Sequence, residues 1–298
     1  MASLKVLRRR IRSITSTQQI TKAMEMVAAA KLRRAQARAA ATWPYARGLT
    51  GMLERVVAVA RERELADPVL AAGTTAGEGT TLLVVLTSDR GMCGGFNTAL
   101  FRAVEERLHA AAPGSLRLAI VGRKGRDYAA SRGWPVTIAF TDMGTDANVA
   151  FARRVTGDVL GRFARREVTR VELLYTHFLS AMRRELTHET FLPIGAGGGG
   201  AATAGGGGGA PAAGGVLLEP GLEPILEELL PRFATARMLA ALADSRASEE
   251  GARMTAMGAA SKNAGELLDQ LVLERNRLRQ TMITREILDI VGGAEALA

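Results

Sequence analysis

Two stretches of helical periodicity, one at each end of the chain, are longer than a compact domain can contain. From Leu4 to about residue 60, apolar residues recur at steps of three and four, and no glycine or proline interrupts them before Pro44. At about 1.5 Å per residue, this helix would be about 85 Å long if straight. A helix of that length must cover its apolar face with another helix, in this chain or in a second one.

The C-terminal pattern is longer still. It starts at Leu222 and continues to Val291, with Pro224 in the first turn and no proline after Pro231. Its seventy or so residues would form about 105 Å of helix. We therefore expect the two chain ends to pair as an antiparallel coiled coil, with a bend at Pro44 and a kink at Pro231. The predicted seam contains Ala, Met and Ser more often than Leu, so we expect surrounding protein to support it.

The middle of the chain has a different sequence pattern, in which short runs rich in β-branched residues alternate with helical segments. This alternation predicts a small, Rossmann-like α/β domain with a mainly parallel, helix-covered sheet. The last two strands follow each other directly, so the second is expected to be an antiparallel edge strand. The expected strands are 82–87, 116–121, 136–140, 171–178 and 184–192, and the expected helices are 98–111, 123–131 and 147–165.

The fold class is therefore α/β with a long antiparallel coiled coil made by the N- and C-terminal helices. Residues 195–215 contain 12 of the 33 glycines and seven alanines, with no charge, so they have little to bury and predict a flexible surface loop. The expected domains are 1–60 for the N-terminal helix, 80–193 for the α/β domain, 194–216 for the loop and 220–298 for the C-terminal helix.

The net charge of +9 belongs to one segment. Residues 1–47 hold 11 Lys or Arg against one acid, Glu25, whereas the rest of the chain is close to neutral. A basic helix can follow a phosphate backbone, and a basic N-terminus can be a transit peptide. However, helical spacing spreads these charges around the helix, and its only aromatic residues, Trp43 and Tyr45, lie near its end and are not interleaved with the charges. An acidic protein surface around the helix fits better than nucleic acid.

Few residues have the pattern of a catalytic or metal site. The three histidines lie in separate elements without metal-ligand spacing, and the single cysteine, Cys93, excludes an intramolecular disulfide and has no base in its motif. We therefore expect structural histidines and a small buried Cys93 in a tight turn. No apolar run approaches the about 20 residues that span a bilayer.

Two glycine-containing turns follow predicted strands and precede helices, where a phosphate-binding loop would lie. Gly91, Gly94 and Gly95 form one, and Gly122 with Gly125 forms the other. Neither matches the spacing of a nucleotide-binding loop, so turns that pack against the sheet are the favoured reading. An anion site, and with it an α/β enzyme, stays open as the alternative.

Three motifs, spread over both ends and the middle of the chain, resemble the gamma subunit of F-type ATP synthases. They are ITKAMEMVAAAKLRRAQ at 20–36, SDRGMCGGFN at 88–97, and the segment from 247 that contains RNRLRQ and is followed by TREILDIVGGAEAL at 284–297. The resemblance implies a non-catalytic central rotor shaft, turned by the proton-driven c ring inside a ring of alpha and beta subunits. The α/β domain would be the foot, beside the epsilon subunit and the c ring.

The resemblance also implies partner contacts but no catalytic, metal, cofactor-binding or direct nucleotide-binding residue. Met24 and Arg253 match positions that pass the beta-subunit levers, and Arg279, Gln280 and Thr284 match polar contacts to a beta-subunit loop. The full set of implied contact residues is Met24, Arg33, Arg34, Arg253, Arg279, Gln280, Thr284, Glu286 and Asp289.

This sequence departs from the family pattern in places. Asp289 stands where Glu is commoner, Glu274-Arg275 replaces a more apolar pair, and the glycine-containing stretch 195–215 is an addition. These changes predict altered shaft contacts, and one cysteine cannot form the disulfide switch of the chloroplast versions. The implied location is peripheral, on the cytoplasmic face of a bacterial inner membrane. Nucleic acid is not an expected partner.

Overall fold

A computed structural model describes residues 4–62, 79–144, 148–194 and 221–295. The glycine-containing stretch expected to be a flexible loop lies outside these residues. The chain divides into two compact units, Met1–Ala29 with Arg253–Ala298, and Ala30–Ala252. Each unit contains part of the two long helices, α1 (Leu4–Glu62) and α6 (Leu222–Glu295).

The second unit is organised around a five-stranded sheet with the order β3-β2-β1-β4-β5. The pairs β1–β2, β2–β3 and β1–β4 are parallel, whereas β5 pairs with β4 antiparallel at one edge. This is the doubly wound order expected of a Rossmann-like domain, with an antiparallel edge strand. The strands are β1 (Thr81–Leu86), β2 (Leu116–Val121), β3 (Val136–Phe140), β4 (Arg170–Phe178) and β5 (Arg184–Leu192).

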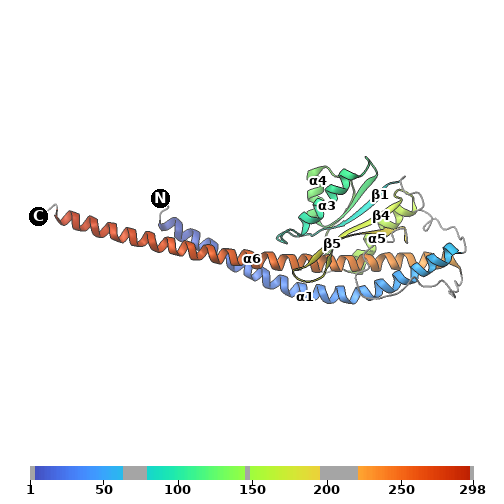
Figure 1. Ribbon diagram of the computed structural model, residues 1–298, viewed down its shortest axis with the longest axis horizontal. Coiled ribbons are helices and arrows are strands. Elements are labelled where there is room, and N and C mark those ends of the chain that lie inside the picture. Colours follow the sequence, from blue (N-terminus) through green and yellow to red (C-terminus); the bar gives the residue numbers. More distant parts are fainter. Residues whose placement is uncertain (1–3, 63–78, 145–147, 195–220, 296–298) are drawn as a thin grey trace. The chain divides into compact units, whose positions relative to one another are not determined.

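Helices cover both faces of this sheet (Figure 1). On one face, alternate strand residues such as Leu83 and Val85 pack against α3 (Phe96–Ala110) and α4 (Arg123–Arg132). On the other, Leu82 and Val84 belong to a core that includes α5 (Val149–Ala164) and the parts of α1 and α6 in this unit. Because β1 is covered on both sides, its sequence TLLVVL is almost continuously apolar and not alternating.

Local sequence signals set the ends of the shorter helices. Asn148 caps α5 by accepting a hydrogen bond from the backbone N–H of Phe151 at 2.7 Å. Helix α4 ends at Gly133, which takes the left-handed conformation common after a helix C-terminus. The observed strands and helices start and end within about two residues of those expected from periodicity, which is the ordinary uncertainty of helix ends.

The long helices continue through their prolines. α1 is continuous through Pro44, and α6 is continuous through Pro231. In the second unit both are held by burial: Leu53 and Val57 of α1 are in the same core as Phe233 and Met238 of α6. Tertiary packing of this kind offsets the helix hydrogen bond that an internal proline removes.

In the first unit, the remaining parts of α1 and α6 pair with each other in antiparallel orientation. A Cβ added to Gly258 would lie 3.3 Å from the Glu25 carboxyl carbon, and one added to Gly265 would lie 2.9 Å from Gln18 Nε2. From Gly258 to Gly265 the chain advances seven residues along α6, while the facing residues on α1 go back seven, from Glu25 to Gln18. This opposite progression is that of an antiparallel coiled coil. The expected pairing of the two chain ends is confirmed in this unit.

The close approach at Gly122 gives a test of the sheet packing. Gly122 has φ +103°, and an added Cβ would lie 2.4 Å from the backbone oxygen of Thr87. We expect Gly122→Ala to destabilise the protein by about 3 kcal/mol, because backbone strain and a steric clash combine. The midpoint of urea unfolding of the purified chain measures this change.

Gly114→Ala is the matched control. Gly114 also has a positive φ, +81°, but nothing lies within 4 Å of its added Cβ. Only the backbone strain is then introduced, at about 1–2 kcal/mol. Equal losses of stability in the two variants would show that the contact with Thr87 does not limit the packing of β1 against β2.

Candidate functional site

The three histidines have structural partners. His109 Nδ1 is 2.7 Å from the carbonyl oxygen of Glu105, His188 Nε2 is 2.8 Å from Glu172 Oε2, and His177 Nδ1 contacts the carboxylate of Asp244. Within the residues that the structure describes, no three His, Cys, Asp or Glu side chains gather as metal ligands. Each described histidine is therefore accounted for by a contact within the fold.

The loop after β1 contains the only cysteine of the sequence. Cys93 is buried in the turn that leads into α3, and Asn97 Nδ2 lies 3.5 Å from its sulfur. Asn97 Nδ2 also donates to Ser88 Oγ at 2.7 Å, and Ser88 Oγ donates to the carbonyl of Arg90 at 2.7 Å. These contacts close the loop on itself, which fits the expected structural role of Cys93.

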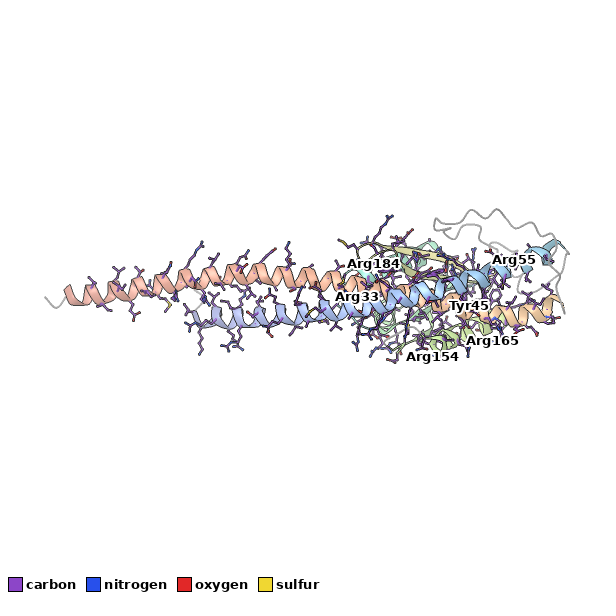
Figure 2. The ribbon with its side chains drawn as sticks, turned by 90° about the horizontal axis from the view of Figure 1, so that it is seen from below. Arg33, Tyr45, Arg55, Arg154, Arg165 and Arg184 are labelled. Atoms are coloured by element: carbon purple, nitrogen blue, oxygen red, sulfur yellow. The ribbon has the colours of Figure 1, made fainter. Side chains whose placement is uncertain are left out.

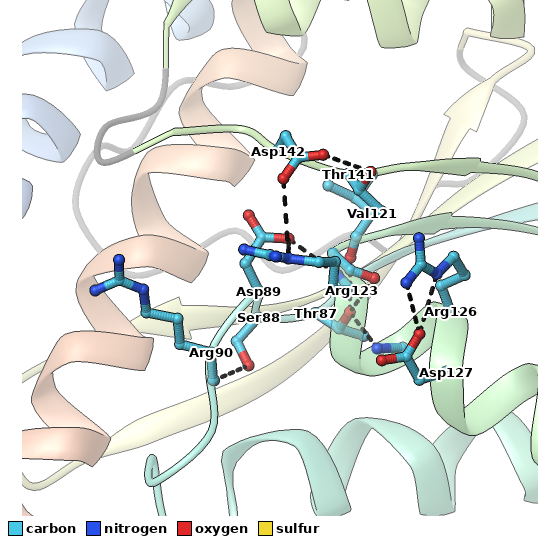
Figure 3. Close-up of polar contacts among 12 residues, drawn as sticks. Thr87, Ser88, Asp89, Arg90, Val121, Arg123, Arg126, Asp127, Thr141 and Asp142 are labelled. Carbon is cyan, nitrogen blue, oxygen red and sulfur yellow. Dashed lines mark hydrogen bonds and ion pairs between the residues drawn. The ribbon is translucent and has the colours of Figure 1, made fainter.

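The N-terminus of α4 is the best candidate for an anion site, but the chain itself fills it (Figure 3). The backbone N–H of Arg123 donates to Asp89 Oδ1, that of Lys124 to the carbonyl of Ser88, and that of Gly125 to Thr87 Oγ1, each at 3.0 Å. A carboxylate of the protein thus takes the place where a phosphate would bind to a helix N-terminus. Gly122 and Gly125 of this turn pack closely on Thr87, as the favoured reading predicted, whereas added Cβ atoms at Gly91 and Gly95 of the other turn would meet nothing closer than 3.7 Å.

A second polar cluster lies within the sheet layer. Glu172 of β4 is almost fully buried and contacts Arg107 of α3, Arg170 and His188. Burial alone would raise the pKa of Glu172, but the hydrogen bond with His188 and the charges of Arg107 and Arg170 lower it overall. The carboxylate therefore stays ionised and joins α3, β4 and β5.

A groove of about 750 Å³ opens between the two helices of the first unit. It lies beside Gly258, where α6 has no side chain, and the Lys22–Glu25 ion pair (3.1 Å) forms part of its wall. Its lining combines charged, amide and small residues with one large apolar side chain: Gln18, Gln19, Lys22, Ala23, Glu25, Met26, Gly258, Ser261 and Lys262. Met24 lies on the same stretch of α1 and is half-buried.

The C-terminal part of α6 has no α1 residue beside it in the described part of the chain. The register set by Gly258–Glu25 and Gly265–Gln18 brings Leu4, the first described residue of α1, opposite Arg279. Of the predicted contact residues in this segment, Arg279, Gln280, Thr284 and Glu286 are all exposed. The side chain of Asp289 lies outside what the structure describes.

The other predicted contact residues differ in environment. Arg33 and Arg34 are exposed on α1 in the second unit, and Figure 2 shows Arg33 projecting from this helix. Arg253 on α6 is buried, with 8% of its surface exposed. The predicted set is therefore not one site: it is distributed along two helices.

Sequence reasoning missed a buried polar segment of α6. Periodicity marked this region as ordinary amphipathic helix, yet every residue from 240 to 253 is buried. The sequence signal that could have revealed it is the small size of the apolar residues in this segment. Small side chains let neighbouring backbone come close to the helix, where polar side chains can form hydrogen bonds with it. The buried polar residues are Asp244, Ser245, Arg246, Ser248, Glu249, Glu250 and Arg253.

These features define a class of protein: one in which two long terminal helices pair as a coiled coil and a Rossmann-like α/β domain lies between them in the sequence. No described helix is both long enough and apolar enough to cross a membrane.

Comparison with known proteins agrees with this class. The family model described as ATP synthase matches residues 3–297. The ATP synthase gamma chain of Heliobacterium modesticaldum is 40% identical over the full length of both chains, and that of Anaeromyxobacter sp. (strain K) is 42% identical, also over both full lengths. The chain belongs to the ATP synthase gamma chain family.

Solved structures have the same fold. A central-stalk and c-ring structure of the Tetrahymena thermophila mitochondrial ATP synthase contains a chain that is 25% identical, with a TM-score of 0.62, over 81% of this chain and 99% of that one. A chain of the Euglena gracilis mitochondrial ATP synthase gives a TM-score of 0.69 at 21% identity, over 99% and 94%. As a gamma subunit, the protein is a non-catalytic central-stalk component and a peripheral part of a membrane-bound complex.

The occupied α4 N-terminus predicts a negative result that tests the enzyme alternative. Because Asp89 accepts from the Arg123 N–H, we expect titration of the purified chain with ATP to give no saturable binding up to about 1 mM. Isothermal calorimetry measures this. Saturable binding that Asp89→Asn strengthens would support an anion site at this turn.

Proposed function

We propose that the paired terminal helices turn as a shaft inside a ring of alpha and beta subunits, with the α/β domain beside the epsilon subunit and the c ring. The observation that carries this proposal is an exposed apolar segment at the end of α6. Such a surface on a helix without a neighbouring helix marks a protein-binding site. Its large exposed residues are Met282, Ile283, Ile287, Leu288, Ile290 and Val291.

The chemistry of this segment suits a bearing. Hydrophobic contact is non-directional, so an apolar sleeve in the alpha/beta head would hold the helix at every rotor angle with similar energy. Hydrogen bonds would favour particular angles instead. Arg279 and Gln280, which come just before the apolar residues, and Thr284, which lies among them, therefore supply the angle-dependent contacts in this proposal.

The basic N-terminal helix supports an acidic surrounding surface. Arg33 and Arg34 are exposed, and the segment 1–47 contains one acid. Exposed ion pairs are worth only about 0.2–1 kcal/mol each, so they can be exchanged during rotation without trapping the rotor. Acidic loops of the beta subunits are the proposed partners of these arginines.

Coupling in this proposal is mechanical. An asymmetric shaft presents a different face to each of three catalytic sites, and each rotor angle favours a different set of subunit conformations. Met24 and Arg253 lie where the two helices would pass the beta-subunit levers. We place the complex on the cytoplasmic face of a bacterial inner membrane, with residues 80–193 as the foot.

The polar contacts can be tested by Arg279→Ala and Gln280→Ala. Each variant loses a hydrogen bond to the beta-subunit loop, so we expect ATP turnover by the assembled complex to fall by about tenfold. Arg285→Ala is the matched control, because Arg285 is also exposed but lies on a different side of α6 from both Arg279 and Gln280. A similar loss in the control would contradict the residue assignment.

A second variant tests coupling at the levers. Met24→Lys places a cation where a half-buried apolar side chain contacts the proposed lever. We expect ATP hydrolysis to continue while proton pumping per ATP falls by about half or more. Met24→Leu keeps the volume and apolar character and is expected to pump normally. Unchanged proton pumping per ATP in Met24→Lys would contradict the proposed contact between Met24 and the beta-subunit lever.

A further inference from the structure

One face of α6 is fastened to the sheet of the second unit by directional polar contacts. Ser248 Oγ donates to the carbonyl of Thr176 at 3.0 Å, and the Asp244 carboxylate contacts His177 Nδ1. One turn beyond Ser248, Gly251 lets the β4–β5 turn approach, since its added Cβ would lie 3.4 Å from the carbonyl oxygen of Ala181. Steps of four and three residues place Asp244, Ser248 and Gly251 on one face of the helix.

Two further contacts extend this junction along α6. Arg237, seven residues before Asp244 and therefore on the same face, pairs with Glu189 of β5. Ser245 Oγ lies 3.5 Å from the carbonyl of Leu86, at the end of β1. Three strands of the sheet thus contact one stretch of α6 through hydrogen bonds or an ion pair.

The His177–Asp244 pair is the most demanding of these contacts. Only 3% of the Asp244 side chain is exposed, and 20% of the His177 side chain. A carboxylate that is buried to this degree is destabilising unless a partner compensates its charge. The Trp43 ring of α1 packs against the His177 ring in a T-shaped arrangement, with 6.0 Å between their centroids, so α1 also covers the pair.

We propose that this junction, with His177–Asp244 at its centre, is the joint through which torque on the α/β domain reaches α6. Apolar layers resist separation but allow sliding, because their attraction is non-directional. Hydrogen bonds to strand carbonyls and a buried ion pair oppose sliding, because a small displacement breaks them. His177 and Asp244 are positioning residues in this account, which rests on the proposed rotor function.

The charge state of His177 makes the joint sensitive to pH. The hydrogen bond with Asp244 raises the pKa of His177 above its ordinary value, against the effect of burial. The acidic groups that face His177 are Asp244 on α6 and Glu185 and Glu189 on β5. Arg237 of α6 forms an ion pair with Glu189. The guanidinium groups of Arg237 and of Arg47 also lie over the ring of Trp43 on α1. Burial raises the pKa of Glu189 above its ordinary value, against the lowering effect of Arg237.

The direction of the effect follows from linkage. A histidine whose folded-state pKa is raised contributes stability in full below its unfolded pKa of about 6.5. That contribution is lost as the pH rises through the higher folded-state pKa. The joint is therefore tightest at mildly acidic pH and weakens at alkaline pH.

The chain contains a matched pair for the experiment. His177→Asn breaks a His–carboxylate contact at the junction, whereas His188→Asn breaks one between β4 and β5 inside the sheet, with Glu172 as its carboxylate. His177→Lys keeps a cation for Asp244 that stays charged at alkaline pH. Each variant is assembled into the complete complex in vesicles, and ATP hydrolysis and ATP-driven proton uptake are measured at about pH 6 and about pH 9.

We expect His177→Asn to lower proton uptake per ATP by about twofold or more at the lower pH, and His188→Asn to leave it unchanged. Amide exchange of the α6 backbone over 241–250 should become about tenfold faster in His177→Asn only. In the wild type, uptake per ATP should fall between the two pH values, and His177→Lys should abolish this fall.

Equal changes in proton uptake per ATP and in amide exchange for His177→Asn and His188→Asn would contradict the proposed joint. A fall in uptake per ATP with pH that persists in His177→Lys would also contradict it. Failure of the rotor proposal gives a different result. In that case, deletion of residues 253–298 would leave ATP hydrolysis and uptake of the complex unchanged, whatever the His177 variants do.

Discussion

The pairing of α1 with α6 is the constraint on which the rest of the structure depends. An α-helix satisfies its backbone hydrogen bonds internally, so its length is not limited by its own chemistry. Its apolar face, however, must be covered. In the first unit each helix covers the other, with glycines at Gly258 and Gly265 that admit Glu25 and Gln18. In the second unit the sheet and α5 complete the cover.

In the described part of the chain, the polar groups that could form a catalytic centre are used in contacts within the fold. At the glycine turn before α4, the backbone N–H groups that could bind a phosphate already donate to Asp89, Ser88 and Thr87. The histidines are used as partners for carboxylates and a carbonyl. What the fold presents outward is helix surface: basic on α1, and apolar at the end of α6.

The two kinds of contact on α6 have different physical roles. Near its C-terminal end, exposed apolar side chains give a surface that can turn in a partner without a preferred angle. Between Arg237 and Gly251, hydrogen bonds and ion pairs hold the helix to the sheet in one position. In the proposed rotor the shaft needs both kinds of contact, because it must turn freely in the alpha/beta head and must stay fixed to the α/β domain.

The sequence by itself determined the elements. Periodicity predicted both long helices, all five strands with the antiparallel edge strand, and the pairing of the chain ends, because these depend on local patterns of apolar residues. Only the tertiary structure decided which polar residues meet. His177 and Asp244 are 67 residues apart in the chain, and Asp89 and Arg123 are 34 apart. Neither pair has a periodic signal, since a long-range hydrogen bond depends on how strands and helices are placed around one core.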